Sequence, residues 1–342
     1  MSTIKLAITH GDINGVGYEV ILKTFSDSRM FEHCTPILYG STKVASYHKK
    51  LLGQLHQDFN FHSIADASQA VEKKFNVINL TQDEVKIDIG KSTDVAGLLS
   101  RQALDRACED LRNGTVDVLV TAPINKKNIQ SNDFDFPGHT EYLSSQFHGD
   151  SLMMMVCDRI RIGIVTNHLS LREVPDAITP ELLMSKIELM HQSLRRDFGI
   201  PMPKIAVLAI DPHAGDKGVI GSQDMDVVKP TIDAAMAKGM LTYGPYPSDG
   251  FFGSSEFNKF DGVLALYHDQ GLIPFKLMSF TDGVNYTAGL PIIRTSPAHG
   301  TGYDIAGKDK ASEQSFRSAV FLACTIQKNR LEYDELNRDP LK

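Results

Sequence analysis

Residues 96–126 read AGLLSRQALDRACEDLRNGTVDVLVTAPINK, a helical pattern followed at once by an apolar run. Through Asn113 the apolar residues recur at spacings of three and four, which predicts an amphipathic helix that ends before Gly114. Residues 116–121 are then rich in valine, without strict alternation of apolar and polar positions. Such a run is typical of a strand covered on both faces, so this segment predicts an α/β fold.

Similar apolar runs occur along the rest of the sequence and are separated by helical patterns. A second helix is predicted to begin at Thr179 and Pro180, because a capping threonine followed by proline is a common helix start. The alternation of the two patterns predicts a largely parallel sheet. The other predicted strands comprise residues 4–9, 36–39, 76–80, 152–157, 162–166, 205–210 and 262–267.

Length and composition limit the classes of protein to which the chain can belong. At 342 residues it exceeds the roughly 250–300 at which a single core stops growing, so either two lobes with a cleft between them or an elaborated single domain is expected. A net charge of −7 with dispersed basic residues argues against a nucleic-acid partner. No apolar run approaches the roughly 18 residues of a membrane span and no signal-peptide pattern is present, so we expect a cytoplasmic protein without a membrane partner.

A glycine-rich turn, THGDINGVG at residues 9–17, follows the first predicted strand. Its glycines permit a tight turn with backbone N–H groups directed toward a ligand. The turn matches neither the G-x-G-x-x-G nor the P-loop pattern, so the usual nucleotide fingerprints are absent. A plain connection between strand and helix is the alternative.

A second candidate site combines TAPINK at residues 121–126 with PGHTEYL at residues 137–143. His139 and Thr140 open a predicted helix, where an imidazole, a hydroxyl and free helix N–H groups suit a phosphate or a carboxylate. The alternative is that Thr140 only caps the helix.

Three histidines, His168, His213 and His268, each lie just beyond a predicted strand. Three imidazoles suit a zinc-like ion that keeps one position free for a substrate oxygen. Their wide spacing carries no local signature, so hydrogen-bonded histidines at strand ends are the alternative. All three histidines share a position just after a strand, and this shared position favours the interpretation as a metal site.

Polar residues near the C-terminus form a third group of candidates. Lys276, Asn285 and Arg294 place two cations and an amide within a short stretch, which suits a doubly charged phosphate. Solvated surface charge is the alternative for each of them taken singly. The glycine-rich residues 299–304 follow, and the carboxylate of Asp304 is placed to accept from a ribose hydroxyl of a nucleotide.

Taken in order along the chain, these segments resemble the 4-hydroxythreonine-4-phosphate dehydrogenase family (PdxA) of pyridoxal phosphate biosynthesis. The resemblance extends from Thr9 to Lys308. One motif would be weak, but seven in register are specific. They read His-Gly-Asp, Thr-Ala-Pro-Ile-Asn-Lys, Pro-Gly-His-Thr-Glu, the segment around His168, Pro-His-Ala-Gly, Tyr-His-Asp-Gln-Gly-Leu-Ile-Pro, and His-Gly-Thr followed by Asp.

The resemblance implies an isocitrate/isopropylmalate-dehydrogenase-like fold with two α/β lobes around a central cleft. It places residues 1–125 and 280–342 in the lobe on the nucleotide side, and residues 126–279 in the lobe with the metal and dimer contacts. It also implies a homodimer with a shared active site, in which histidines from both subunits hold one divalent ion. Zinc is favoured, and magnesium, manganese and cobalt remain open.

The activity implied by the resemblance is oxidation of 4-phosphooxy-L-threonine at C3 with NAD or NADP, followed by decarboxylation to 3-amino-2-oxopropyl phosphate. Asp249 and Asp269 are candidates for proton handling or for orienting an imidazole. The implied metal ligands are His168, His213 and His268. The implied substrate contacts are His139, Thr140, Lys276, Asn285 and Arg294. The implied nucleotide loop contains His299, Gly300 and Asp304.

Several residues depart from the usual pattern of the family. Ile13 and Tyr18 stand where prolines are common, and Asp211 stands where asparagine is common. Ser170 and Ala298 also differ, but none of the five removes a metal or substrate residue. The substrate therefore stays open to a sister dehydrogenase acting on 4-phospho-threonate or 4-phospho-erythronate. A phosphate acyltransferase-like protein and a non-catalytic metabolite-binding protein are more distant alternatives.

Overall fold

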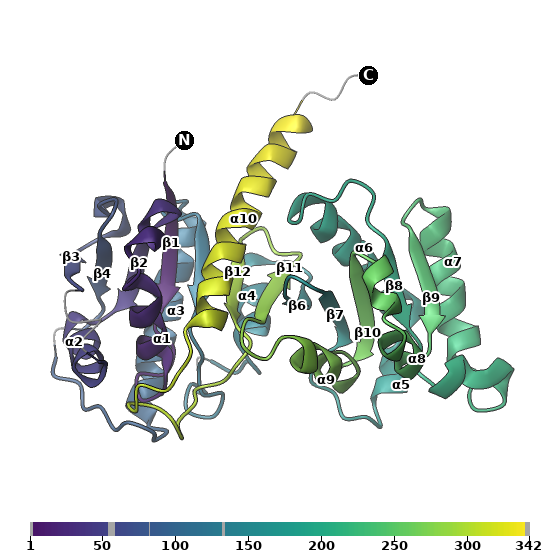
Figure 1. Ribbon diagram of the computed structural model, residues 1–342, viewed down its shortest axis with the longest axis horizontal. Coiled ribbons are helices and arrows are strands. Elements are labelled where there is room, and N and C mark those ends of the chain that lie inside the picture. Colours follow the sequence, from purple (N-terminus) through teal and green to yellow (C-terminus); the bar gives the residue numbers. More distant parts are fainter. Residues whose placement is uncertain (1–2, 54–58, 82, 132–133, 339–342) are drawn as a thin grey trace. The chain divides into compact units, whose positions relative to one another are not determined.

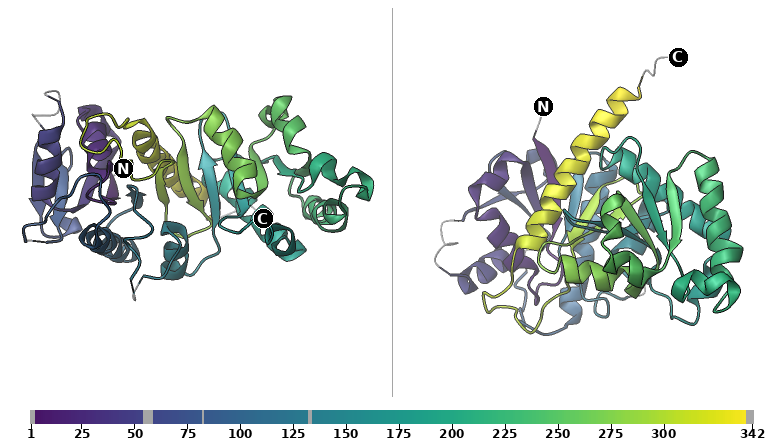
Figure 2. Two further views of the ribbon diagram at one scale, coloured as in Figure 1. Left: turned by 90° about the horizontal axis from the view of Figure 1, so that it is seen from below. Right: turned by 45° about the vertical axis from the view of Figure 1, so that its right-hand side comes forward.

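The computed structural model describes residues 3–53, 59–81, 83–131 and 134–338, and the chain divides into two compact units. Unit 1 comprises Met1–His148 and Pro291–Gln327, and unit 2 comprises Gly149–Leu290 and Lys328–Lys342. Each unit has its own strands covered by helices (Figures 1 and 2). The resemblance places the boundaries after residues 125 and 279, whereas the units divide after residues 148, 290 and 327.

Unit 1 is built on a parallel sheet in the order β3-β4-β2-β1-β5-β12. Its centre is buried on both faces, as the continuous apolar runs predict, with Leu6, Ala7 and Ile8 fully inaccessible. The strands are β1 (Ile4–Thr9), β2 (Cys34–Gly40), β3 (Phe61–Ile64), β4 (Phe75–Asn79), β5 (Val118–Thr121) and β12 (Arg294–Pro297).

Helix α3 (Asp94–Arg112) is the amphipathic helix predicted at the start. The side chain of Thr93 caps it by accepting from the backbone N–H of Ala96, and its apolar face packs on β1 and β2. The other helices of unit 1 are α1 (Gly17–Phe25), η1 (Ser28–Glu32), α2 (Thr42–Leu51), η3 (Ala67–Gln69), α4 (His139–Phe147) and the first part of α10 (Gln314–Leu336).

Unit 2 contains strands in the order β11-β6-β7-β10-β8-β9. β6 runs antiparallel to both β7 and β11, and the remaining pairs are parallel. The carboxyl ends of β7, β10 and β8 therefore lie at the same edge. The strands are β6 (Leu152–Val156), β7 (Arg161–Thr166), β8 (Ile205–Leu208), β9 (Thr242–Tyr246), β10 (Gly262–Tyr267) and β11 (Val284–Ala288).

Helix α6 (Pro180–Arg196) begins where the sequence predicts. The hydroxyl of Thr179 accepts from the backbone N–H of Leu182, and Leu183, Ile187 and Met190 bury one face against the sheet. Among the residues described, every helix is too short or too polar to span a membrane. The other helices are α5 (Val174–Ala177), η4 (Pro212–Gly218), η5 (Asp224–Val228), α7 (Lys229–Ala237), α8 (Ser248–Gly253), η6 (Glu256–Lys259) and α9 (His268–Met278).

The predicted α/β fold class is confirmed, and most of the strand pairs are parallel, while β6 pairs antiparallel with β7 and β11. All eight predicted strands are present, as β1, β2, β4, β5, β6, β7, β8 and β10. Strands β3, β9, β11 and β12 are not predicted, because their sequences mix polar with apolar residues and give no continuous run.

Candidate functional site

The three candidate metal ligands follow the carboxyl ends of three neighbouring parallel strands in unit 2. His168 follows β7, His268 follows β10 and His213 follows β8. Ligands of α/β proteins bind at this edge of a parallel sheet. The topology of unit 2 therefore brings the three segments to the edge where a site is expected.

His168 and His268 lie side by side, with ring centroids 6.0 Å apart and ring planes inclined by 37°. The Nδ1 atom of His268 lies 2.7 Å from the Oδ1 atom of Asp269, so a hydrogen bond to this carboxylate leaves Nε2 directed to another ligand. Metal-binding histidines commonly donate their other ring N–H to a carboxylate in this way. Two imidazoles of unit 2 therefore fit a zinc-like ion.

His213 is not grouped with these two rings. Within the described part of the chain, no three His, Cys, Asp or Glu side chains lie close enough together to hold one metal ion. His213 lies in η4, where it has a left-handed backbone with φ of 55°. The structure thus brings together two of the three predicted ligands, and the role of His213 stays a prediction.

The two candidate carboxylates lie in the first turns of their helices. Asp249 is an exposed residue of α8, and Asp269 is an exposed residue of α9 that contacts His268. Asp269 is therefore placed to orient an imidazole, one of the two roles predicted for it. Among the described residues, no hydrogen bond or ion pair of Asp249 favours either role.

Gln270, which the sequence analysis did not single out, joins the segments that carry these residues. Its side-chain amide donates to the Ala209 carbonyl at 2.6 Å and to the Ser248 hydroxyl at 2.9 Å. Its amide oxygen accepts from the backbone N–H of Leu266 at 2.6 Å. A buried and fully used amide of this kind fixes the ends of β8 and β10 and the start of α8. The sequence feature that could have identified Gln270 is its position directly after His268 and Asp269.

Lys276 and Asn285 are the candidate substrate contacts of unit 2. Lys276 is exposed in the last turn of α9, and Asn285 is a partly buried residue of β11. The amide oxygen of Asn285 is buried without a hydrogen-bond partner among the described residues. Buried polar atoms are rarely left unpaired, so a bound ligand is a natural partner for this amide.

Arg294 is a buried cation of unit 1, at the first residue of β12. Its side chain donates from Nε and Nη2 to the hydroxyl of Thr121, at 3.0 and 2.7 Å, and Arg294 is only 3% exposed. Burial lowers the pKa of Arg294 to about 9, and the nearby negative charge of Glu141 opposes part of that decrease. Arg294 therefore stays charged near neutral pH, and a buried cation favours a bound anion.

His139 is the first residue of α4, and the N-cap residue before it is Gly138, which offers no side-chain cap. Thr140 lies inside the first turn, so the interpretation of Thr140 as the capping residue is wrong. Removal from water lowers the pKa of His139 well below its usual value, and the positive charges of Arg294 and Lys126 lower it further. His139 is therefore neutral at pH 7, beside helix N–H groups that suit an anion.

Lys126 is a member of this cluster that we did not predict as a ligand. Its Cε atom lies 3.7 Å from the position that a Cβ atom would occupy at Gly138, and a carboxylate oxygen of Glu141 lies 3.4 Å from the same position. The absence of a side chain at Gly138 leaves room for both groups beside His139. The signal in the sequence was the end of the Thr-Ala-Pro-Ile-Asn-Lys motif, directly after β5.

The glycine-rich turn after β1 packs against the loop after β12 in unit 1. The backbone N–H of Val16 donates to the Thr301 carbonyl at 2.9 Å, and a Cβ atom at Gly15 would lie 2.6 Å from the same oxygen. The hydroxyl of Tyr303 donates to the buried carboxylate of Asp12 at 2.7 Å. The glycine therefore permits the two loops to meet, and a role of the turn in ligand binding stays a prediction.

The predicted nucleotide loop presents exposed residues at His299, Gly300 and Asp304. The Nδ1 atom of His299 lies 2.9 Å from the Gly300 carbonyl, and Lys308 donates to the Asp304 carbonyl at 2.7 Å. Apart from Gly300 and its two chain neighbours, the described residues place no atom within 4 Å of the position that a Cβ atom would occupy at Gly300. The loop is thus held in place while its outer side is open, and its role in nucleotide binding stays a prediction.

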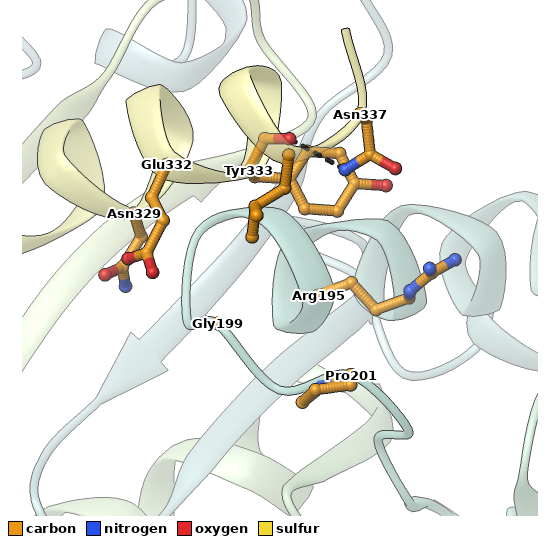
Figure 3. Close-up of a pocket in the computed structure, with 8 residues that line it drawn as sticks. Arg195, Gly199, Pro201, Asn329, Glu332, Tyr333 and Asn337 are labelled. Atoms are coloured by element: carbon orange, nitrogen blue, oxygen red, sulfur yellow. Dashed lines mark hydrogen bonds between the residues drawn. The ribbon is translucent and has the colours of Figure 1, made fainter. Parts of the chain in front are cut away.

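A pocket of about 350 Å³ lies elsewhere in unit 2 (Figure 3). Its lining comes from the end of α6, the segment before β8 and the last turns of α10, and includes Arg195, Pro201 and Tyr333. Because β8 begins at Ile205, this pocket adjoins the amino end of that strand rather than the edge that carries the histidines. None of the predicted site residues lines it, so it is not the candidate site.

Comparisons with known sequences all match this chain to one family of proteins. The profile of a family described as "Pyridoxal phosphate biosynthetic protein PdxA" matches residues 32–323. A protein of Bacteroides thetaiotaomicron named 4-hydroxythreonine-4-phosphate dehydrogenase is 51% identical over 341 residues, which cover 99% of this chain and 93% of that protein. A protein of the same name from a Sulfurihydrogenibium species is 37% identical and covers 96% of this chain and 99% of its own length.

Solved structures share the fold of this chain. The crystal structure of 4-hydroxythreonine-4-phosphate dehydrogenase from Klebsiella pneumoniae matches with a TM-score of 0.81 at 32% identity, over 95% of this chain and all of that chain. A terephthalate 1,2-cis-dihydrodiol dehydrogenase from Burkholderia xenovorans matches with a TM-score of 0.62 at 21% identity, over 95% of this chain and 98% of its own. The second likeness concerns the fold alone.

Proposed function

This chain belongs to the PdxA family of pyridoxal phosphate biosynthetic proteins, and from this membership we propose that it is a metal-assisted NAD(P)-dependent dehydrogenase. Its substrate is 4-phosphooxy-L-threonine, which is oxidised at C3 and then loses CO2 to give 3-amino-2-oxopropyl phosphate. The observation that carries the proposal is the buried cation of Arg294 beside the neutral imidazole of His139. This arrangement supports recognition of a small anionic substrate.

The phosphate of the substrate binds at the N-terminus of α4. Arg294 supplies a forked and partly desolvated cation, and Lys126 supplies a second positive charge. His139 is neutral, so it can donate a hydrogen bond to a phosphate oxygen without adding a third charge. Thr140, in the same helical turn, adds a hydroxyl. Lys276 and Asn285 of unit 2 are further substrate contacts that the family resemblance implies.

His168 and His268 supply two imidazoles to one divalent ion, with Asp269 orienting His268. We assign the third imidazole, His213, to a second copy of the chain, because one chain does not group three such ligands in its described residues. A bound ion would supply Lewis-acid polarisation of the substrate hydroxyl, and a bound nicotinamide would supply the hydride acceptor. Asp249 and Asp269 are the candidates for moving a proton.

The second copy of the chain docks on the exposed side of α9. Ile273 and Leu277 lie four residues apart on α9 and are 59% and 84% exposed, and Phe280, just after the end of the helix, is 83% exposed. Exposed large apolar side chains that cluster on and beside one helix are typical of a protein–protein interface. The same helix begins with His268, so this interface supports a homodimer with a shared site.

The nicotinamide cofactor, NAD or NADP, binds at the loop of residues 299–304. The open space around Gly300 and the exposed carboxylate of Asp304 support this assignment. The contact of this loop with the turn at residues 9–17 supports a fixed binding surface.

The test is the formation of NADH, followed at 340 nm with 4-phosphooxy-L-threonine in the presence of zinc or of a chelator. We expect reduction of NAD that the chelator abolishes and that added divalent ions restore. Dephosphorylated substrate is expected to lose most of kcat/KM, because the phosphate supplies binding energy remote from the reacting carbon. Activity only on a phosphorylated threonate or erythronate would instead assign the chain to a sister reaction.

A further inference from the structure

The turn that carries His213 has an unusual backbone. Five consecutive residues, His213 to Lys217, have left-handed backbone angles, with φ of 55°, 52°, 75°, 43° and 55°. Only the third of them is glycine. A left-handed conformation is unfavourable for each of the other four, since the Cβ atom then approaches the next carbonyl. The surrounding structure must therefore hold this turn in place.

Two features hold the turn at residues 213–217 in place. The buried carboxylate of Asp224 accepts from the backbone N–H of Ile210 at 2.9 Å and from that of Asp211 at 3.0 Å, one with each oxygen. On the other side of the turn, a Cβ atom at Gly221 would lie 2.1 Å from a carboxylate oxygen of Asp211. A Cβ atom at Gly215 would lie 2.3 Å from the carbonyl oxygen of Gly221. The turn is thus clamped between Asp224 and Gly221.

A carboxylate is required at position 224 if both N–H groups are to be satisfied. Asparagine has one oxygen acceptor, and its NH2 group would face the second backbone N–H, donor against donor. Both N–H groups belong to the segment that leads from β8 into η4, two or three residues before His213. The direction in which the chain leaves the sheet, and with it the position of the imidazole, depends on this pair of hydrogen bonds.

We propose that Asp224 is a positioning residue that fixes the His213 imidazole for metal binding. The inference rests on the proposed function, in which His213 is a metal ligand. Asp224 acts through the backbone of residues 210–217 and does not itself contact substrate, cofactor or ion.

The experiment compares Asp224→Asn with Asp226→Asn in the full-length chain. Asp226 is an exposed carboxylate in the same short helix, so its substitution is the matched control. The readouts are the affinity for Zn²⁺, by competition with a chromophoric chelator, and amide hydrogen exchange over residues 210–221. We expect D224N to weaken zinc binding by roughly 10- to 100-fold, as loss of an orienting partner does, and to speed exchange in this segment. D226N should stay within twofold of the parent chain.

The variants His213→Ala and His213→Ala with Asp224→Asn separate the inference from the function on which it rests. If Asp224 acts through His213, the double variant should bind zinc no more weakly than H213A alone. Additive losses would overturn the inference, and so would zinc binding by D224N equal to that by D226N. Zinc binding by H213A equal to that of the parent chain would instead overturn the proposed role of His213.

A second variant covers the case in which D224N does not fold, as judged by circular dichroism and thermal unfolding. Gly221→Ala disturbs the same turn from its other side, because the added methyl group collides with the Asp211 carboxylate. Its expected effect is the same loss of zinc affinity with native secondary structure. Unchanged zinc affinity in G221A together with faster exchange of residues 210–221 would show that the turn does not position the ligand.

Discussion

Tyr18 is fully buried between two imidazoles in unit 1. Its ring stacks on His10 at 5.3 Å and on His48 at 5.1 Å, with planes inclined by 16° and 12°. His48 donates from Nε2 to the Ile13 carbonyl at 2.8 Å, and the backbone N–H of Ser41 donates to the Tyr18 hydroxyl at 3.2 Å. The Tyr18 ring therefore fills the space between the two histidines.

This stack predicts that the protein loses stability in mild acid. Burial lowers the pKa of His10 and of His48 from 6.5 to about 4. The unfolded chain therefore binds protons that the folded chain excludes, so stability is complete above pH 6.5 and is lost as the pH falls toward 4. Between pH 7 and 5 each imidazole contributes a loss of roughly 1–2 kcal/mol.

Urea unfolding at pH 5, 6 and 7 measures this effect. The variant His48→Gln should show a flatter dependence of unfolding free energy on pH than the parent chain, because one of the two titrating groups is gone. His33→Gln, at an exposed histidine, is the control and should leave the slope unchanged. Equal slopes for all three chains would contradict the prediction.

A second prediction at this scale concerns the charge of Lys126. Lys126→Gln should raise KM for the phosphorylated substrate by roughly 3- to 10-fold, since a charge-assisted contact to an exposed lysine contributes about 1 kcal/mol. Lys127→Gln is the matched control, because Lys127 is the adjacent exposed lysine. Steady-state kinetics at several salt concentrations provides the measurement. The role of Lys126 is refuted if the two variants have the same KM.

Among the elements, α9 combines the proposed metal site with the proposed dimer contact. Leu277→Glu together with Phe280→Glu should shift the chain toward a monomer in analytical ultracentrifugation, because two buried charges would be placed in an apolar interface. The monomer should lose zinc affinity and activity if the site is shared. Leu336→Glu is the control, since Leu336 is a comparably exposed leucine of α10. A stable dimer in the double variant would move the interface to another surface.

Apolar runs predict a strand only where the strand is buried through apolar side chains, and not where it is buried through paired polar groups. β5 is buried through Val118, Leu119 and Val120, and the sequence therefore reveals it. β12, which reads Arg-Thr-Ser-Pro, is buried along its whole length because its polar groups are paired. The hydroxyl of Thr295 donates to the Ala319 carbonyl at 2.8 Å, for example. Hydrogen bonding of this kind leaves no apolar pattern, so neither the strand nor the burial of its first residue could be predicted.

The candidate site was predictable in its residue types and less so in its geometry. Strand ends place His168 and His268 at one edge of a parallel sheet, and the structure agrees. The left-handed turn at His213 was not predictable, because four of its five residues have side chains that disfavour it. The conformation of this turn depends on partners outside it, such as Asp224, and residue propensity does not register them.

At the scale of the whole molecule, the chain passes three times from one unit to the other. It enters unit 2 at Gly149, returns to unit 1 at Pro291 and enters unit 2 again at Lys328, inside α10. The length of the chain predicts two lobes or an elaborated single domain, and the sequence shows no linker. The last boundary lies within a continuous helix, where no linker pattern is expected. The homodimer and the cytoplasmic location belong to this scale as well, and both stay predictions.

The C-terminal part of α10 is fixed in unit 2 by a buried ionic cluster. Arg330 donates from Nε to Asp197 at 2.7 Å, and Tyr286 donates to the same carboxylate at 2.6 Å. The two charged side chains are 8% and 3% exposed. Removing one partner of such a pair leaves a buried charge uncompensated, which costs about 3–5 kcal/mol. An exposed ion pair contributes about 1 kcal/mol or less.

Arg330→Met should therefore destabilise unit 2 by about 3–5 kcal/mol, and Arg196→Gln by less than about 1 kcal/mol. The second variant is the matched control, because Arg196 pairs with Asp334 between the same two helices at 2.8 Å, with side chains 39% and 55% exposed. Calorimetric unfolding measures both. If the two units unfold separately, only the transition of unit 2 should move in R330M; if α10 couples them, a single transition should move as a whole. Equal shifts in the two variants would show that burial of the Arg330 pair carries no extra stability.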